Sequence, residues 1–429
     1  MKATIRNQTL LVTGLNSLIR VMGFVLRILL SRFLGAEMMG IAELASGVHM
    51  MAITPLTSGL PMAISRLTAK AKTHRETEPL QAGLRLVRHV SFFLIPVFLV
   101  LSPWLAKATG DMRVLPSLWF TAPCILILGY SGVYNGYCYG VKRSYLPAVS
   151  ELTEQTLRVL LTIATLPFLR HLTAPWKAAV PVASTMIAEI AGLVLVIGIL
   201  RIPLMGNEDI HQWHKPILQL AVPSTITRLI HTLLRSVTSI IIPARLIASG
   251  LPVSEATARL GMLNGMVLPL MMAPCIFTGA FSMVMAPRLA QSDENARLCK
   301  QFLIKLFAAG LAVSLGCTVS MALLAPLFAI VVYRLPELTI LFRAASPLCL
   351  LCALENLTVG AITSLGLQKA AVYGALPSSL AAMLITWFLT AQPTLRLNGV
   401  IIGLAAGHLL GILWNGCIIA RWWRNHTDL

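Results

Sequence analysis

The amino-acid sequence predicts an all-α membrane protein of about twelve transmembrane helices, in two pseudo-symmetric six-helix lobes around a central cavity. Three observations support this: the composition, the apolar segments and a repeat between the halves. Of the 429 residues, 57% are hydrophobic and 12% are charged, whereas a soluble domain is about 45–50% apolar and about 25% charged. So few charged side chains cannot cover a water-soluble particle, so most of the surface must face lipid.

The charge balance fits a membrane protein and argues against a nucleic-acid partner. The 34 Lys and Arg residues outnumber the 16 Asp and Glu residues, which gives a formal net charge of +18. In a soluble protein this excess would suggest nucleic-acid binding. Here the basic residues lie mainly in short gaps between apolar segments, a pattern that orients helices and meets anionic head groups. We therefore expect membrane lipids, and no nucleic acid, as partners.

The apolar segments are long enough to cross a bilayer, whose core of about 30 Å needs about 20 mostly apolar residues per helix. They cover approximately residues 9–33, 40–64, 87–106, 115–138, 148–169, 177–200, 216–242, 260–286, 302–332, 338–364, 370–390 and 398–420. An even number of spans puts both termini on one side. The loops of that side carry more Lys and Arg, which predicts that both termini are cytoplasmic.

A repeat connects the two halves of the chain. Arg20 and Arg27 are seven residues apart in the first span, and Arg228 and Arg235 are seven apart in the seventh. Two halves of six spans each insert with the same orientation, which predicts a substrate site between them. The expected lobes cover residues 1–205 and 206–429.

The sequence carries no signature of an enzyme, a cofactor or a metal site. It has no G-x-x-x-x-G-K-[ST] loop for ATP. Its eight cysteines are scattered through apolar segments, and Cys349 and Cys352 have no second ligand pair nearby, so packing explains them better than zinc. We expect a protein that is not an enzyme and needs no cofactor.

The arginines of the first and seventh spans are the candidate binding residues. A charged side chain at the bilayer centre costs about 2.5–3.5 kcal/mol, so arginines there are expected to have a function. A spacing of seven residues is close to two helical turns, which puts each pair on one face. The candidate substrate-binding residues are Ser17, Arg20, Arg27, Ser224, Arg228, His231 and Arg235.

A structural alternative is that these arginines only pair with carboxylates and lock helices together. Glu154 lies four residues before Arg158, so we expect those two to form a structural ion pair. Glu43, Glu189 and Glu355 then remain for four arginines, so positive charge should stay in the cavity. Guanidinium groups bind phosphate in a bidentate manner, which predicts an anionic, phosphate-bearing substrate.

Intramembrane carboxylates and histidines can also carry a coupling ion. The candidates for such a relay are Glu43, His49 and Glu189, with Na⁺ or H⁺ as the ion. For His49 the simpler interpretation is a hydrogen bond to a neighbouring helix.

Two stretches of the sequence resemble a known family. The first comprises residues 20–24 (RVMGF), 30–37 (LSRFLGAE), 39–41 (MGI) and 58–66 (SGLPMAISR), and the second comprises 132–136 (GVYNG), 147–150 (PAVS) and 154–158 (EQTLR). They resemble the stage V sporulation protein B branch of the polysaccharide flippases, which is related to the lipid II flippases. This branch belongs to the multidrug/oligosaccharidyl-lipid/polysaccharide exporter (MOP) superfamily. Asn135 stands where that family usually has Gln.

The resemblance implies two six-helix lobes around a central cavity in the bacterial cytoplasmic membrane. It also implies a monomeric flippase that moves an undecaprenyl-pyrophosphate-linked saccharide, a peptidoglycan precursor or polysaccharide unit, from the inner to the outer leaflet. Cell-wall synthesis proteins would be further partners, in growth or in sporulation. Two alternatives stay open: a cation-coupled multidrug antiporter of the same superfamily, which would need unpaired carboxylates, and a non-transporting membrane scaffold for envelope or spore-cortex synthesis.

Overall fold

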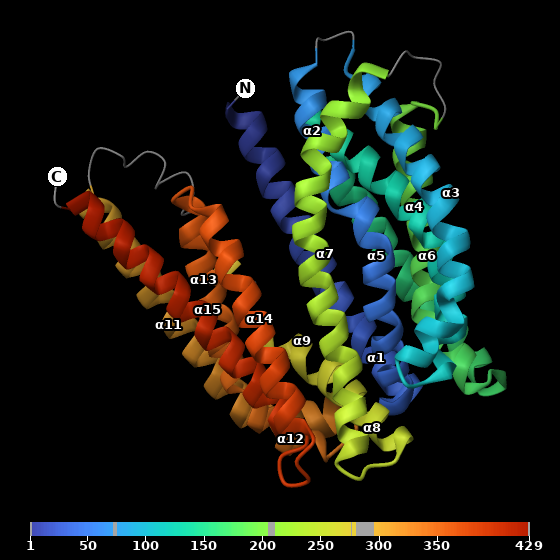
Figure 1. Ribbon diagram of the computed structural model, residues 1–429, viewed down its shortest axis with the longest axis vertical. Helices are drawn as coiled ribbons and strands as arrows, with labels where there is room; N and C mark the ends of the chain where they lie inside the picture. Colours follow the sequence, from blue (N-terminus) through green and yellow to red (C-terminus); the bar gives the residue numbers. More distant parts are fainter. Residues whose placement is uncertain (1, 72–74, 205–210, 276, 280–295, 428–429) are drawn as a thin grey trace. The chain divides into compact units, whose positions relative to one another are not determined.

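The computed structural model describes residues 2–71, 75–204, 211–275, 277–279 and 296–427, and their regular structure is helical (Figure 1). The α-helices are α1 Lys2–Thr57, α2 Gly59–Lys70, α3 Thr77–Ala108, α4 Leu115–Gly140, α5 Tyr145–Thr165, α6 Ala174–Leu200, α7 His211–Ala248, α8 Val253–Leu260, α9 Leu268–Met271, α11 Ala296–Pro326, α12 Leu338–Ala345, α13 Pro347–Ser364, α14 Gln368–Thr390 and α15 Leu397–Thr427. Shorter 3-10 or π helices are η1 Met112–Val114, η2 Leu166–His171, η3 Gly261–Val267 and η4 Leu327–Val332.

Within the described residues, 8 helices are long and apolar enough to cross a membrane. They are Thr77–Ala108, Met112–Gly140, Ala174–Leu200, Gln212–Ala248, Gln301–Val332, Leu338–Ser364, Lys369–Thr390 and Leu397–Arg424. Each coincides with one predicted span. The predicted spans 9–33 and 40–64 lie in α1 and α2, and 148–169 lies in α5 and η2. The span 260–286 begins in η3 and α9, while its residues 276 and 280–286 lie outside the described part.

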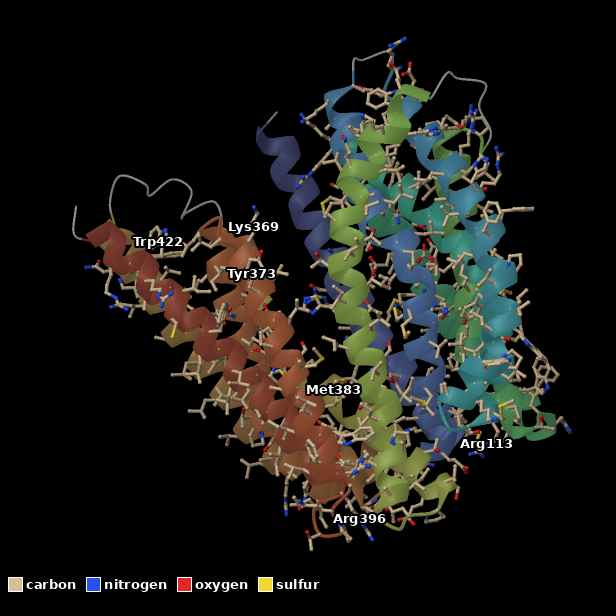
Figure 2. All side chains as sticks on the ribbon, in the orientation of Figure 1. Arg113, Lys369, Tyr373, Met383, Arg396 and Trp422 are labelled. Carbon is tan, nitrogen blue, oxygen red and sulfur yellow. The ribbon has the colours of Figure 1, made fainter. Side chains whose placement is uncertain are left out.

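α1 divides at Gly35 into the first two predicted spans. The backbone there has a φ of 78° and a ψ of 171°, a conformation that glycine adopts readily and other residues avoid. Arg113 of η1 donates to Glu37 at 2.7 Å and to Asp111 at 2.8 Å, which holds η1 against the residues just after the turn (Figure 2). The second half of α1 therefore returns along the first.

The chain forms two compact units, Met1–Ile240 and Ile241–Leu429, called unit 1 and unit 2 below. The predicted lobe boundary, after residue 205, falls within residues 205–210, which lie outside the described part.

The first thirty residues of α7 belong to unit 1 and lie along the second half of α1 and the start of α2 (Figure 1). The Gly59 amide donates to Thr225 Oγ1 at 3.2 Å, and Ser236 Oγ donates to the Gly47 carbonyl at 2.8 Å. A Cβ on Gly59 would collide with the Ala221 carbonyl of α7. The absence of a side chain at Gly59 is thus what lets the two backbones come this close.

α4 is the central helix of unit 1, where it packs against α1, α2, α3 and α6. A Cβ on Gly136 would lie 3.0 Å from Pro61 Cα, so a glycine is needed where α4 crosses α2. Tyr134, also on α4, is fully buried and donates its hydroxyl to the Ile202 carbonyl at 2.8 Å. This bond fixes the segment that follows α6 against the centre of unit 1.

In unit 2, α15 packs against both α14 and α13. Gly403 and Gly407 recur at a spacing of four on the side of α15 that faces α14. A Cβ on Gly403 would lie 2.9 Å from the Ala382 carbonyl, and one on Gly407 would lie 2.7 Å from Ala382 Cβ. Such small residues at every fourth position let transmembrane helices pack closely.

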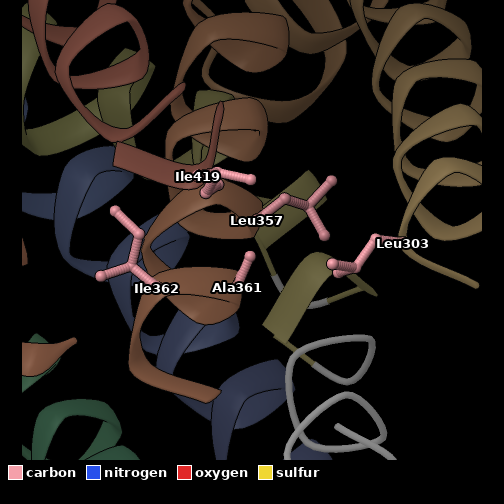
Figure 3. Packing of buried hydrophobic residues seen from close by; sticks show 5 residues of the cluster. All are labelled: Leu303, Leu357, Ala361, Ile362 and Ile419. Atoms are coloured by element: carbon pink, nitrogen blue, oxygen red, sulfur yellow. The ribbon is translucent and has the colours of Figure 1, made fainter. Parts of the chain in front are cut away.

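A buried apolar cluster joins α11, α13 and α15 (Figure 3). It consists of Leu303, Leu357, Ala361, Ile362 and Ile419, and each is at most 5% exposed. Leu357 of α13 points toward Leu303 of α11, and Ile419 of α15 lies next to α13 (Figure 3). This packing fixes α13 between α11 and α15. It thereby also fixes the position of Cys352 and Glu355, which precede Leu357 on the same helix.

Candidate functional site in unit 1

α1 and the first part of α7 carry the predicted arginine pairs, and both contribute to unit 1. Arg27 Nη2 donates to Glu43 Oε1 at 2.6 Å. Because α1 reverses at Gly35, these two side chains meet although they are 16 residues apart in the sequence. The side chains of Arg27 and Glu43 are 37% and 17% exposed, so the pair is only partly shielded.

Glu43 also faces α7. Arg235 of α7 attracts Glu43 electrostatically. Its neighbour Ser236 is hydrogen-bonded to the Gly47 carbonyl, one turn after Glu43. Glu43 is therefore paired with Arg27 and lies within electrostatic range of Arg235.

The other predicted substrate-binding residues have different surroundings. Arg20 and Arg228 are exposed, and among the described residues neither has a hydrogen-bond or ion-pair partner. Ser224 donates to carbonyls of its own helix, at 3.0 Å to Leu220 and 3.2 Å to Ala221. Ser17 is exposed and His231 is half-buried. The structure pairs Arg27 with Glu43, and the convergence of the seven predicted residues in one site stays a prediction.

Arg158 is paired differently from the sequence-based expectation. Its Nη2 donates to Glu189 Oε1 of α6 at 2.6 Å, with the two side chains 20% and 8% exposed. Glu154, the expected partner of Arg158, accepts a hydrogen bond from Ser150 at 2.9 Å instead. Both carboxylates are buried, so exposure does not decide between them; the packing of α5 against α6 turns Arg158 toward Glu189.

Two cavities with ionisable side chains in their lining lie in unit 1. One of about 240 Å³ is lined by both ion pairs, Arg27–Glu43 and Arg158–Glu189, and by His49. His49 Nδ1 lies 3.1 Å from Thr121 Oγ1, which fits the simpler interpretation of that histidine. Since each guanidinium in this cavity already has a carboxylate partner, an incoming anion would have to compete with a carboxylate.

The other cavity, of about 350 Å³, is lined by Asn135, Glu151, Glu154, Gln155, Arg158 and Glu189 among others. Asn135 Oδ1 and Gln155 Oε1 are buried and have no hydrogen-bond partner among the described residues. Asn135 and Gln155 are not among the site residues predicted from the sequence, although both line this cavity. The polar positions 151, 154, 155 and 158 recur every three or four residues on α5, and this pattern could have indicated a polar face.

Sequence reasoning also missed a polar contact in unit 2. His408 Nδ1 lies 2.5 Å from Glu355 Oε2, and His408 Nε2 lies 3.1 Å from Cys352 Sγ. Residues 355 and 408 are 53 positions apart in the chain, and nothing in their spacing indicates a contact. Among the residues that the structure describes, no group of three or more His, Cys, Asp or Glu side chains could hold a metal ion.

Comparisons with known proteins agree with this fold. The chain is 25% identical to stage V sporulation protein B of Bacillus subtilis (strain 168), over 98% of this chain and 84% of that protein. The structure of a multidrug resistance MATE family transporter of the MOP superfamily, inward-facing, matches with a TM-score of 0.73 and 16% identity, over 94% of this chain and 95% of that one. The inward closed structure of the lipid II flippase MurJ matches with a TM-score of 0.76 and 12% identity, over 96% and 87%.

These matches confirm the predicted all-α membrane fold of the MATE and MurJ type. The model of one protein family, described as polysaccharide biosynthesis protein, matches residues 5–293, which is more than half of the 429 residues. The chain therefore belongs to the polysaccharide biosynthesis protein family.

Proposed function

We propose that this protein is a flippase that moves an undecaprenyl-pyrophosphate-linked saccharide from the inner to the outer leaflet by alternating access. The saccharide is a peptidoglycan precursor or a polysaccharide unit. The similarity to stage V sporulation protein B and the fold of the lipid II flippase MurJ support a lipid-linked substrate. The protein acts as a monomer, without cofactor or metal, beside the enzymes that make and use cell-wall precursors.

The observation that carries the proposal is the excess of guanidinium groups over carboxylates along α1 and α7. Arg27 is paired with Glu43, Arg235 lies within electrostatic range of the same carboxylate, and Arg20 and Arg228 have no ion-pair partner among the described residues. Four arginines less one carboxylate leave three positive charges in helices that cross the membrane. Such charge is costly in lipid, so a site for an anionic head group explains it better than helix packing does.

The pyrophosphate is the part of the substrate that these residues would bind. Its phosphates are ionised at neutral pH, and arginine binds phosphate oxygens with two parallel N–H···O bonds. In the inward-open state the head group would contact Arg20 and Arg228 and then displace Glu43 from Arg27. The polyprenyl tail would remain in lipid while the lobes rock to open outward.

The membrane potential can drive this movement without ATP. Moving a negative charge outward across an inside-negative membrane releases about 2.3 kcal/mol per charge per 100 mV. Return of the empty carrier would be favoured by re-formation of the Arg27–Glu43 pair, which neutralises part of the site in the absence of substrate.

One observation favours a second candidate, a multidrug antiporter of the same superfamily. The cavity of about 350 Å³ is lined by three carboxylates, those of Glu151, Glu154 and Glu189, and by one guanidinium, that of Arg158. An excess of carboxylates suits a cationic ligand. This cavity shares Arg158 and Glu189 with the smaller one beside Arg27, but Glu151 and Glu154 line only the larger cavity. The two functions therefore predict different sensitive residues.

A binding experiment separates these functions. The purified protein is mixed in detergent with an undecaprenyl-pyrophosphate disaccharide, and complexes are counted by native mass spectrometry with a cationic dye as competitor. The test variant is Arg20→Ala/Arg228→Ala. The matched control is Arg66→Ala/Lys70→Ala, which removes the same charge from exposed positions at the end of α2.

The flippase predicts that the lipid binds the wild type and the control, and that the test variant loses binding at least tenfold, equivalent to about 1.4 kcal/mol. Dye binding that Glu151→Gln abolishes, with equal lipid binding by the wild type, the test variant and the control, would replace the flippase by the antiporter. If neither ligand binds, the membrane scaffold becomes the better interpretation.

A further inference from the structure

Unit 2 holds a short chain of three ionisable side chains inside its helix packing. Cys352 and Glu355 are one turn apart on α13, and His408 lies opposite them on α15. The imidazole bridges them: Nδ1 lies 2.5 Å from Glu355 Oε2, and Nε2 lies 3.1 Å from Cys352 Sγ. The Glu355 and His408 side chains are 25% and 26% exposed, and Cys352 is 8% exposed.

A glycine in α15, Gly411, lets the Glu355 side chain approach the backbone of that helix. A Cβ on Gly411 would lie 3.0 Å from the carboxyl carbon of Glu355, so the carboxylate rests directly on the backbone of α15. One turn further, Asn415 Nδ2 donates to Thr358 Oγ1 at 3.1 Å, which fixes α15 against α13 beyond the site. The distance between carboxylate and imidazole is therefore set by helix packing on both sides.

The groups around the pair are thiols and amides. Cys275 lies close enough to interact with Glu355 and is hydrogen-bonded to Asn356, and Cys349 Sγ lies 3.5 Å from Met271 Sδ. From α11, Cys317 interacts with Cys349. In the described part of unit 2, the ion-pair partner of Glu355 is His408, and neither Lys nor Arg lies within 4.0 Å of its carboxylate.

These surroundings determine which ligand the pair can hold. A hard cation such as Na⁺ takes several oxygen ligands, whereas one carboxylate, one imidazole and one thiol face each other here. With Glu355 ionised and His408 protonated, the pair has no net charge, which a partly buried site favours. Release of one proton leaves a single negative charge, so the free energy of the pair depends on its access to water or to a compensating cation.

The Cys352 thiol can hydrogen-bond to His408 both when the imidazole is protonated and when it is neutral. A thiol both donates and accepts a hydrogen bond, and an imidazole nitrogen does one or the other according to its protonation. When His408 is protonated, Nε2–H donates to Cys352 Sγ and Nδ1–H donates to Glu355. When His408 is neutral, Nδ1–H still donates to Glu355 while Nε2 accepts from the rotated Cys352 S–H. Both states keep every nitrogen hydrogen-bonded, so neither leaves an unsatisfied buried group.

We propose that Glu355 and His408 form a proton-binding site in unit 2 that takes up and releases one proton in each transport cycle, with Cys352 as the positioning residue. This inference rests on the proposed transport function, because it assigns H⁺ as the ion coupled to the movement of the lipid. The step is a proton exchange between His408 and water, so it forms and breaks N–H and O–H bonds only and needs no oxidant or reductant.

The test uses the full-length protein in liposomes that contain a fluorescent undecaprenyl-pyrophosphate saccharide, with and without a pH difference of one unit across the bilayer. For one coupled proton, this difference shifts the ratio of lipid between the leaflets by about tenfold. The double variant Glu355→Gln/His408→Gln should lose the shift and still flip the lipid down its gradient. Because both charges are removed together, it keeps a hydrogen-bonded pair and should fold.

Two further variants separate proton binding from loss of structure. Cys352→Ser keeps a group that donates and accepts and should keep the tenfold shift, whereas Cys352→Ala should reduce it. Glu337→Gln removes an exposed carboxylate at the start of α12 and should behave as the wild type. A full shift in the Glu355→Gln/His408→Gln protein would overturn the proposal, as would a shift that follows a Na⁺ gradient instead of the pH difference.

Failure of the proposed function is distinguishable from failure of the proton site. If the lipid is not flipped but a pH difference drives a cationic dye across the membrane, and the double variant abolishes this, the proton site stands and the flippase does not. If the wild type flips the lipid and the pH difference does not change the ratio of lipid between the leaflets, the flippase function is supported and the proton-site proposal is refuted.

Discussion

Replacing Glu43 by Gln should tighten the binding of the pyrophosphate head group. In the wild type Arg27 already donates to Glu43 at 2.6 Å, and Arg235 attracts the same carboxylate. An anion that uses these guanidinium groups must first release them from Glu43. The binding free energy of the anion is therefore less favourable than it would be for unpaired arginines. The difference is the free energy of the interaction between Glu43 and Arg27 that the anion replaces.

The geometry limits the size of this effect. An exposed ion pair contributes about 0–1 kcal/mol, and breaking a fully buried one costs about 3–5 kcal/mol. The Arg27 and Glu43 side chains are 37% and 17% exposed, so the pair lies between these cases and nearer the first. We take about 1–2 kcal/mol, which corresponds to an affinity about 5- to 30-fold higher for the Glu43→Gln protein.

Titration of the purified protein with an undecaprenyl-pyrophosphate saccharide, followed by native mass spectrometry, measures this difference. Glu337→Gln, which also removes one carboxylate, serves as the control and should bind as the wild type does. Raising the salt concentration should reduce the difference in affinity between the Glu43→Gln protein and the wild type. Salt partly screens both the Arg27–Glu43 interaction and the attraction between the arginines and the head group. Equal or weaker binding by the Glu43→Gln protein would refute the idea that Glu43 competes with the substrate.

Three further predictions concern stability and the proton site. Glu189→Gln leaves Arg158 without its partner and should lower the stability by about 3–5 kcal/mol, seen as a lower midpoint of thermal unfolding in detergent. Gly59→Ala should also lower that midpoint, because a Cβ there collides with a carbonyl of α7; an unchanged midpoint would mean that α7 does not approach this closely. Gly411→Ala should displace the Glu355 carboxylate and abolish the transport response to pH, while Gly416→Ala, with no atom within 4 Å of the new Cβ, should keep it.

The sequence contained enough information to predict the fold class and most of the helices. Apolar length alone identified the spans, and the gap after residue 33 marked the turn at Gly35. The pairing of Arg158 was not predictable in the same way. The i,i+4 spacing within one helix favoured Glu154 as the partner of Arg158. The rotation of α5 against α6 instead turns Arg158 toward Glu189. That rotation depends on packing over the whole interface and not on spacing within one helix.

The arginine positions illustrate the same limit. A spacing of seven residues correctly indicates that two side chains share one helix face. It does not indicate which neighbouring helix that face meets. The Arg27–Glu43 pair depends on the turn at Gly35, and the approach of Arg235 to Glu43 depends on the docking of α7 through Ser236. The Glu355–His408 contact depends in turn on a glycine at position 411, whose importance is visible only when α13 lies against it.

The docking of α7 on unit 1 has a consequence for biosynthesis. The bond from the Gly59 amide to Thr225 joins residues that are 166 positions apart. While the first six helices are being inserted into the membrane, the residues of α1 and α2 that contact α7, such as Gly47 and Gly59, do not yet have that helix as a neighbour. Nascent chains should therefore stay sensitive to membrane chaperones and proteases until residue 240 has been inserted, and chains arrested before and after α7 should differ sharply in their lifetimes.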